Sequence, residues 1–153
     1  MVYPFLFTLA YTGARREEVR LLKWDHIDFE NGLMTFKDTK SGLDRTIRMG
    51  PTLSAFLQSL PRISDWVCMS QFGWLLSRSQ IDENIEILQR RHPAMKRWRC
   101  HDLRHSFAFN FLKRGGDMYA LRAILGHKTI QLTVDLYGHF SSEHVRNVSP
   151  YES

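Results

Sequence analysis

Apolar and polar positions alternate along the first third of the chain in two different periods. In residues 14–23, Val19 and Leu22 are apolar among charged neighbours, which predicts a helix with one inward face. The stretches LMTFK and RTIRM alternate apolar and polar residues on either side of DTKSGLD. This pattern predicts a β-hairpin with a glycine-containing turn.

The middle of the chain predicts two more helices. Pro51 marks a helix start, and the following apolar positions lie on one helical face: Leu53, Phe56, Leu57 and Leu60. Residues 66–76 have room for another short strand. A further helix is expected over residues 81–91, because its pattern stops before Pro93.

The last third is predicted to be helical almost throughout. From His101 apolar residues recur at helical spacing until Gly115 and Gly116 end the run. Asp117 then caps the helix MYALRAIL, and Thr129 caps a final helix. The expected fold class is therefore α+β, mostly α-helical with a small antiparallel sheet.

Length and charge limit the classes of protein that fit. The 153 residues, 43% of them hydrophobic, suit a single domain over 1–153 with a real core. Lys and Arg number 21 against 16 acidic residues, and this net charge of +5 favours a polyanionic partner. Two cysteines make no disulfide framework, and the apolar start VYPFLFTLAYTG lacks a basic leader and is too short to span a bilayer. We therefore expect a cytoplasmic protein with no membrane partner.

The pentapeptide HDLRH, residues 101–105, is the first candidate for chemistry. On a helix His101 and His105 share a face, as in zinc proteases, and His127 supplies a possible third ligand. Arg104 lies close to the same side, where a metal ion would repel it. A guanidinium flanked by imidazoles suits an oxyanion instead, because all of these groups donate hydrogen bonds. The zinc site stays open as an alternative.

Other polar residues carry little weight when each is taken alone. Arg15 at a helix start, Lys40 in a turn and Tyr137 on a helix all have ordinary structural explanations. Five cations lie before His101, and such a run is either a solvated face or a set of contacts to phosphates. These candidates for the DNA backbone are Arg90, Arg91, Lys96, Arg97 and Arg99.

Taken together, four segments resemble the catalytic domain of the tyrosine recombinases, the phage integrase family. TGARREEVRLLKWDHID is similar to the box of the first catalytic arginine, and TKSGLDRTIRM to the hairpin of the catalytic lysine. HDLRHSFA resembles the H-x-x-R box, and LGHKTIQLTVDLYGH the box that ends in the nucleophile. The resemblance implies six catalytic residues, Arg15, Lys40, His101, Arg104, His127 and Tyr137, with Glu18 and His105 in support. Lys37 shares the hairpin and stays an alternative to Lys40.

This resemblance implies a site-specific DNA recombinase that works without metal or cofactor. Tyr137 would attack a phosphodiester of double-stranded DNA and form a 3′-phosphotyrosine, while the arginines and His127 hold the phosphate. Lys40 would protonate the leaving 5′-oxygen, and His101 would assist proton transfer or orientation near the tyrosine.

The resemblance also carries expectations about the whole protein. The N-terminal DNA-binding domain of the family is absent, so this chain is expected to be a truncated, catalytic domain of bacterial or phage origin. The full-length protein is expected to act as a tetramer of protomers on DNA. Three alternatives are weighed: the zinc hydrolase above, a topoisomerase IB-like nicking and rejoining protein, and a non-catalytic DNA-binding remnant.

Overall fold

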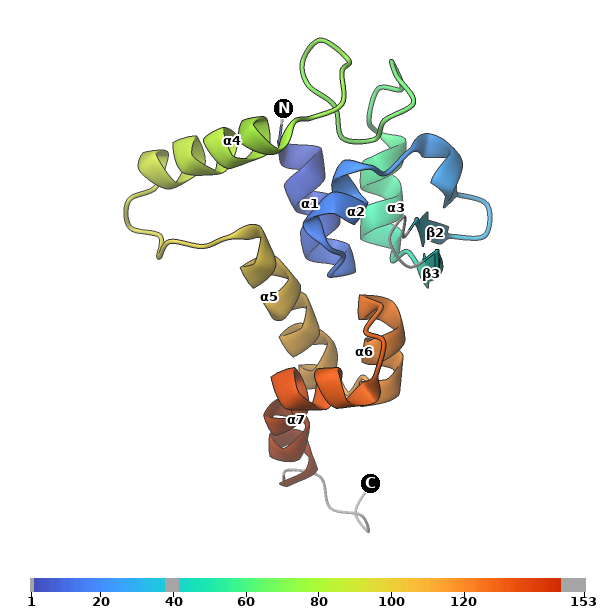
Figure 1. Cartoon of the computed structure of the whole chain (residues 1–153), viewed down its shortest axis with the longest axis vertical. Coiled ribbons are helices and arrows are strands. Elements are labelled where there is room, and N and C mark those ends of the chain that lie inside the picture. The colour runs from blue at the N-terminus through green and yellow to red at the C-terminus, as the bar shows by residue number, and fades with distance from the viewer. Residues whose placement is uncertain (1, 38–41, 147–153) are drawn as a thin grey trace.

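The structure is a computed structural model, and it describes residues 2–37 and 42–146. Within these residues, helices make up most of the molecule and a three-stranded sheet lies at one edge of its upper part (Figure 1). The elements in chain order are α1 (Tyr3–Thr12), α2 (Arg16–Arg20), the 3-10 helix η1 (Trp24–His26), β1 (Ile27–Asp28), β2 (Leu33–Phe36), β3 (Arg45–Arg48), α3 (Pro51–Gln58), α4 (Arg78–Arg91), α5 (Cys100–Lys113), α6 (Met118–Leu125) and α7 (Ile130–Arg146).

The sheet is a small antiparallel meander in the order β1-β2-β3. Met34 pairs with Ile47, and both side chains are buried together with Phe36. The intervening residues face outward, as a strand period of two requires. The predicted hairpin is confirmed at its two strands, while residues 38–41 of its turn lie outside the described residues.

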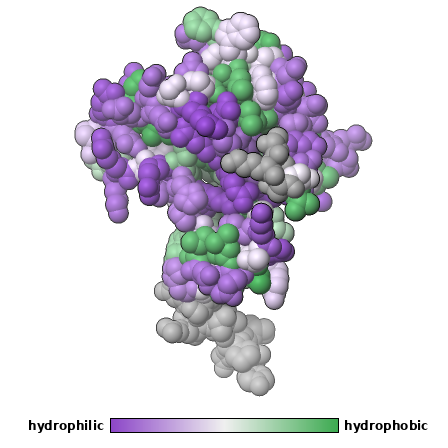
Figure 2. Space-filling model, in the orientation of Figure 1, coloured by the Kyte–Doolittle hydropathy of each residue, from purple (hydrophilic) through white to green (hydrophobic). Residues whose placement is uncertain are grey.

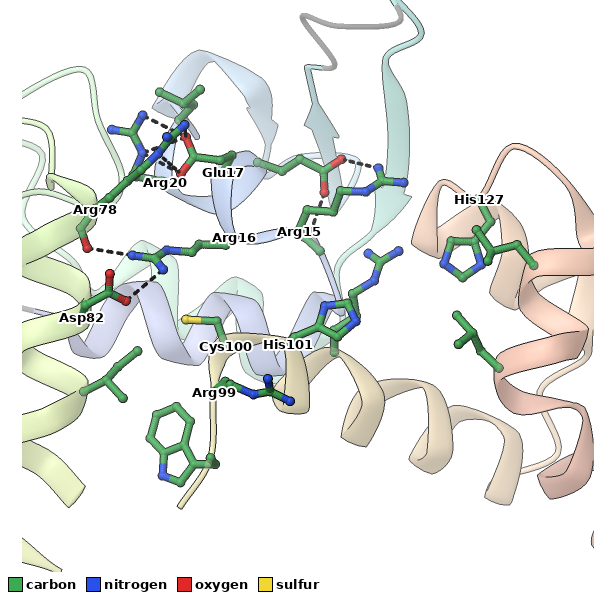
Figure 3. A pocket seen from close by; sticks show the side chains of 18 of the residues that line it. Arg15, Arg16, Glu17, Arg20, Arg78, Asp82, Arg99, Cys100, His101 and His127 are labelled. Carbon is green, nitrogen blue, oxygen red and sulfur yellow. Dashed lines mark hydrogen bonds and ion pairs between the residues drawn. The ribbon is translucent and has the colours of Figure 1, made fainter. Parts of the chain in front are cut away.

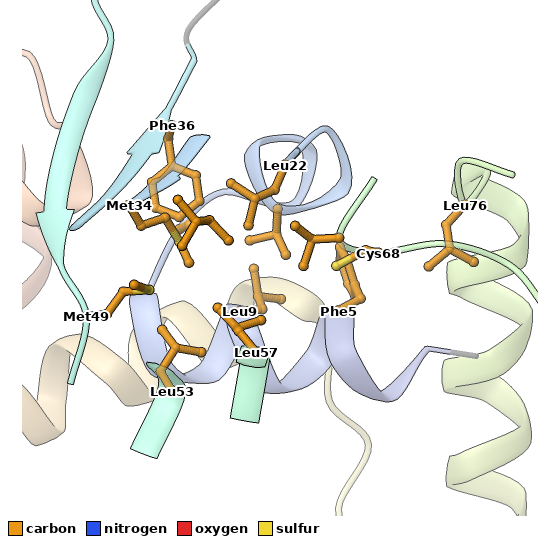
Figure 4. Close-up of a cluster of buried hydrophobic side chains, with 14 of the residues drawn as sticks. Phe5, Leu9, Leu22, Met34, Phe36, Met49, Leu53, Leu57, Cys68 and Leu76 are labelled. Atoms are coloured by element: carbon orange, nitrogen blue, oxygen red, sulfur yellow. The ribbon is translucent and has the colours of Figure 1, made fainter. Parts of the chain in front are cut away.

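The larger hydrophobic core lies between α1, the sheet and α3, and it extends to α4 (Figure 4). Phe5 and Leu9 of α1 are almost completely buried in it. No helix was predicted over this apolar run, because a helix buried on most sides shows no amphipathic period. Pro4 in the first turn and Gly13 at the C-cap, with a φ of 62°, delimit α1.

A second, smaller core joins α5, α6 and α7 in the lower part of Figure 1. Its buried residues are Ala108, Leu112, Leu121, Leu125 and Tyr137. Helix α5 connects the two cores, because it packs against α1 as well as against α6 and α7. The site described below lies where the two parts meet.

Other differences from the predicted elements are local. Helix α2 covers only residues 16–20 of the predicted 14–23, and residues 66–76 form an isolated bridge between Met69 and Leu75 instead of a strand. The three helices predicted after residue 100 are confirmed, with Asp117 capping α6 through its carboxylate. The predicted fold class is therefore confirmed.

The surface is divided between polar and apolar regions. Hydrophilic side chains cover most of the upper body in Figure 2, and hydrophobic side chains gather over α7 below it. Leu132 and Leu136 are among the exposed apolar residues of α7. In the described part of the chain, no helix combines the length and the apolar character that crossing a membrane requires.

Candidate active site

Arg15 occupies the N-cap of α2 and is held there by Glu18. The backbone N–H of Arg15 donates to Glu18 Oε2 at 2.6 Å, and its Nη1 lies 3.3 Å from Glu18 Oε1. Its Nη2 donates to the carbonyl oxygen of Gly126 at 3.0 Å. The side chain is still 45% exposed, so this guanidinium has donors directed to solvent as well.

Arg104 lies on α5 and is buried, with 3% of its surface exposed. Its Nη1 donates to the Gly13 carbonyl at 2.7 Å and its Nη2 to the Leu125 carbonyl at 2.8 Å. Burial, together with the nearby charges of Arg15 and Arg45, lowers the pKa of Arg104 to about 10. The group stays charged at neutral pH, so a cation is held below the surface by backbone carbonyls and attracts an anion.

His127 directly follows the C-cap of α6 and is also buried. Its Nδ1 lies 2.8 Å from the hydroxyl oxygen of Thr133 on α7, which fixes the orientation of the ring. Burial lowers the pKa of His127 to about 4, and the cationic arginines Arg104, Arg15 and Arg45 add to this shift. The imidazole is therefore neutral at pH 7, where it has one donor and one acceptor nitrogen.

The pKa of His127 predicts a loss of stability in acid. An unfolded histidine has a pKa near 6.5 and binds its proton before the folded one does, so the folded state loses stability as the pH falls from 6.5 to 4. The free energy of unfolding should fall by about 1–2 kcal/mol more in the wild type than in His127→Gln, since solvent at the cleft screens part of the effect. Urea unfolding at pH 7, 5.5 and 4.5 measures this difference. The prediction would be contradicted if the free energy of unfolding fell with pH by the same amount in the two proteins.

Tyr137 lies on α7 with only 2% of its surface exposed. Its hydroxyl oxygen is 2.8 Å from Nδ1 of His105, and the His101 ring meets the His105 ring edge to face at 4.5 Å between centroids. Burial raises the pKa of Tyr137, and the charge of Arg104 offsets part of that rise. Burial lowers the pKa of His101, and the neighbouring His105 and Arg104 add to this shift.

These side chains line one cleft of 1210 Å³ (Figure 3). Arg15, His101, Arg104, His127 and Tyr137 all contribute to its wall, which comes from α2, α5, α7 and the segment after α6. Eight Lys and Arg side chains and three carboxylates line the cleft, so its charge suits a polyanion. The eight cationic residues are Arg15, Arg16, Arg20, Lys37, Arg78, Arg99, Arg104 and Lys128.

The predicted DNA-backbone candidates separate into two groups. Arg99 lines the cleft beside α5, with its side chain 85% exposed. The other four are exposed but are not among the residues that line the cleft, and Arg90 forms an ion pair with Glu86 on its own helix. These four are Arg90, Arg91, Lys96 and Arg97.

The predicted catalytic lysine, Lys40, lies outside the described residues. Its alternative, Lys37, lines the cleft, and its Nζ forms an ion pair of 2.7 Å with Asp44 Oδ2 across the hairpin. The choice between the two lysines therefore stays a prediction.

Sequence reasoning missed two residues that hold the site. Arg45 on β3 pairs with Glu18, and Thr133 orients His127. A signal for Arg45 was present, because it alternates with Ile47 and Met49 on the buried face of the strand. Thr133 gave no comparable signal, since a threonine on a helix is ordinary.

The zinc alternative finds no support in this geometry. Among the described residues, no group of three or more His, Cys, Asp or Glu side chains is placed to hold a metal ion. His101 and His127 lie on different walls of the cleft in Figure 3, with Arg104 on α5 also lining it.

Comparison with known proteins places the chain in a family. Residues 3–144 match the model of the phage integrase family. Tyrosine recombinase XerC of Xanthomonas campestris pv. campestris (strain B100) is 31% identical over 149 residues, which cover 94% of this chain and 46% of that protein. Tyrosine recombinase XerA of Pyrococcus furiosus is 31% identical over 143 residues, covering 88% of this chain and 49% of that protein. The chain thus spans about half the length of these curated relatives.

Solved structures share the fold. The catalytic domain of bacteriophage HP1 integrase superposes with a TM-score of 0.69 at 29% identity, over 94% of this chain and 77% of that one. A crystal structure of XerA recombinase gives a TM-score of 0.77 at 24% identity, over 98% of this chain and 59% of that one. The family model covers nearly the whole chain, and three of the four sequence segments that resemble the family contribute residues to the walls of one cleft. This chain belongs to the phage integrase family, as its sequence predicted.

Proposed function

We propose that this chain is the catalytic domain of a site-specific DNA recombinase, which cleaves and rejoins DNA strands through a tyrosine. The observation that carries the proposal is the cleft itself, where a buried and charged Arg104 faces the same space as Arg15, His127 and Tyr137. The relatives reported above are recombinases and integrases, and none of them is a topoisomerase or a zinc hydrolase.

Arg15, Arg104 and His127 would hold the scissile phosphate. Each guanidinium already has two or more donors fixed by backbone carbonyls or by Glu18, which leaves its other N–H groups oriented before DNA binds. Such preorganised donors stabilise the charge that grows on the non-bridging oxygens in the transition state. Neutral His127 adds a hydrogen bond through its Nε2–H when the Thr133 hydroxyl donates to Nδ1.

Tyr137 would be the nucleophile. Its oxygen attacks the phosphorus, the bond from phosphorus to the 5′-oxygen breaks, and a 3′-phosphotyrosine and a free 5′-hydroxyl result. Because burial raises the pKa of this phenol, its proton needs an acceptor in the site. His105 is the group that contacts the hydroxyl, and His101, next to it, contacts His105.

His105 is therefore expected to contribute directly to the rate of cleavage, because it contacts the hydroxyl of the proposed nucleophile. His105→Phe should slow adduct formation by about 10-fold to 100-fold, since it removes the partner of the tyrosine hydroxyl. His105→Asn places a polar atom near the position of Nδ1 and should retain more of the rate. Single-turnover cleavage by both variants measures this, and exposed His92→Asn is the control. Equal rates for His105→Phe and the wild type would refute the role.

Lys40 remains our candidate for the acid that protonates the 5′-oxygen, with Lys37 as the alternative. The ion pair with Asp44 engages Lys37 and so favours Lys40, whose own position is outside the described residues.

The proposed partner is double-stranded DNA, bound along the cationic cleft. Contacts to phosphates would make binding steeply dependent on salt. Relatives in the same fold include a XerH recombinase bound to its difH substrate and a Tn1549 integrase bound to transposon DNA. A tetramer on DNA, an additional N-terminal DNA-binding domain in the longer protein and a cytoplasmic location stay predictions.

A covalent adduct tests this function directly. The chain is incubated with a library of nicked duplexes of randomised sequence. Cleavage near the nick releases a short strand that diffuses away, so the strands cannot be rejoined and the covalent product accumulates. We expect a DNA adduct that survives SDS and disappears on proteolysis, and a released short strand whose new 5′-hydroxyl polynucleotide kinase can label. An adduct joined to a 5′ end, or no adduct with any sequence, would overturn the proposal.

A further inference from the structure

Arg45, the first residue of β3, is a nearly buried cation on the hairpin. Its Nη2 donates to Glu18 Oε2 at 2.9 Å, and its Nη1 donates to Glu18 Oε1. Its Nε donates to the Ile124 carbonyl at 2.7 Å, and its side chain is 13% exposed. Arg45 is not among the residues that line the cleft, so any effect on the reaction has to pass through its partners.

The C-terminal end of α6 brings three arginines together. Three consecutive carbonyls at this end each accept from a different guanidinium: Ile124 from Arg45, Leu125 from Arg104 and Gly126 from Arg15. Carbonyls at a helix C-terminus lack partners within the helix and carry partial negative charge, which suits cations. Arg45 therefore belongs to the same assembly as the two proposed phosphate-binding arginines.

Glu18 is shared between Arg15 and Arg45. Its side chain is 8% exposed and accepts from the backbone and the guanidinium of Arg15 as well as from Arg45. Two cations on one carboxylate leave a net positive charge, whereas Arg15 alone with Glu18 would make a neutral pair. Without Arg45, Glu18 would therefore draw the charge of Arg15 away from the phosphate.

We propose that Arg45 is a positioning residue that neutralises Glu18 and fixes it against the end of α6, which keeps Arg15 available to the scissile phosphate. The inference rests on the proposed function, since it assigns Arg15 to the phosphate. If Arg45 acts by neutralising Glu18, removing the charge of Glu18 should compensate for the loss of Arg45. A purely structural role of Arg45 predicts no such compensation.

The test compares Arg45→Ala, Arg45→Lys and the double variant Arg45→Ala with Glu18→Gln. Single-turnover adduct formation is measured with protein in excess over a nicked duplex recovered from the library above, below the unfolding transition of each variant. With saturating protein the rate constant reports the folded protein bound to DNA, and the urea unfolding curve of each variant shows that it is folded under these conditions. Arg48→Ala is the matched control, because Arg48 is an exposed cation on the same strand.

Arg45→Ala should slow adduct formation by about 10-fold to 100-fold, because Arg15 is misplaced while the DNA-binding cations remain. Its affinity for the same duplex should match that of Arg48→Ala, and Arg45→Lys should lie between Arg45→Ala and the wild type. The double variant should recover about tenfold of the lost rate, since the neutral amide that replaces the Glu18 carboxylate no longer competes for Arg15 by charge.

Two results would overturn the inference alone: a double variant slower than Arg45→Ala, or an Arg45→Ala rate equal to that of Arg48→Ala. A wild-type chain that forms no adduct would overturn the proposed function and this inference together.

Discussion

Tyr137→Phe is expected to form no covalent adduct while it binds DNA as the wild type does. The substitution removes only the hydroxyl, so the ring still fills the core formed by α5, α6 and α7. Loss of a nucleophile should lower the rate of adduct formation by about 10⁴-fold or more. Loss of the hydrogen bond to His105 should cost only about 1 kcal/mol of stability.

Tyr119→Phe is the matched control for this variant. Tyr119 lies on α6 with 72% of its surface exposed, and it takes no part in the cleft. Adduct yield on gels with SDS and affinity measured by fluorescence anisotropy separate chemistry from binding. An adduct that persists in Tyr137→Phe, mapped by mass spectrometry to another residue, would show that the nucleophile has been misassigned.

Arg104→Lys should give the second largest loss. The lysine keeps the positive charge. Its single ammonium group cannot reach the carbonyls of Gly13 and Leu125 and a phosphate at the same time, as the planar guanidinium of Arg104 can. We expect cleavage to slow by about 10²-fold to 10³-fold, the usual effect of removing a donor that acts on the transition state. One carbonyl left without a donor should also lower the free energy of unfolding by about 1–3 kcal/mol.

Single-turnover cleavage and urea unfolding measure these two effects separately. Arg90→Lys is the control, because Arg90 forms an exposed ion pair on α4 away from the cleft. The DNA affinity of Arg104→Lys should change little, since the net charge is the same. Cleavage within tenfold of the wild type would exclude Arg104 from the phosphate site.

The sequence predicted the elements that carry a clear period or a clear cap. Asp117 and the stop at Gly126 placed α6, and the alternation around the hairpin turn placed β2 and β3. Helix α1 was missed because apolar residues on nearly all sides leave no period to detect. Its burial depends on partners that come from other parts of the chain.

The candidate site was also predicted only in part, because local motifs can be read from the sequence whereas contacts between distant residues cannot. Arg104 was found because a guanidinium suits an oxyanion, and His127 was assigned to the phosphate through the resemblance to the family. The structure places both at one cleft with Arg15 and Tyr137. Arg45 was missed because its role depends on Glu18 and on a carbonyl of α6, which lie 27 and 79 residues away in the chain. Pairing over such distances is created by the fold, so the alternation of Arg45 with Ile47 and Met49 indicates the buried face of the strand but not the partners of Arg45. The catalytic roles themselves stay predictions until the variants are measured.

The contact of three arginines with the end of α6 determines which substitutions the structure can accommodate there. Every residue type carries a carbonyl, so Ile124 and Leu125 can be exchanged for other apolar residues without loss of these hydrogen bonds. Gly126 has no such freedom, because its φ is 69° and a Cβ would lie 2.9 Å from Cδ of Arg45. The guanidinium groups thus recognise the path of the backbone, and Gly126 is the residue at this helix end whose side chain, if it had one, would disturb that path.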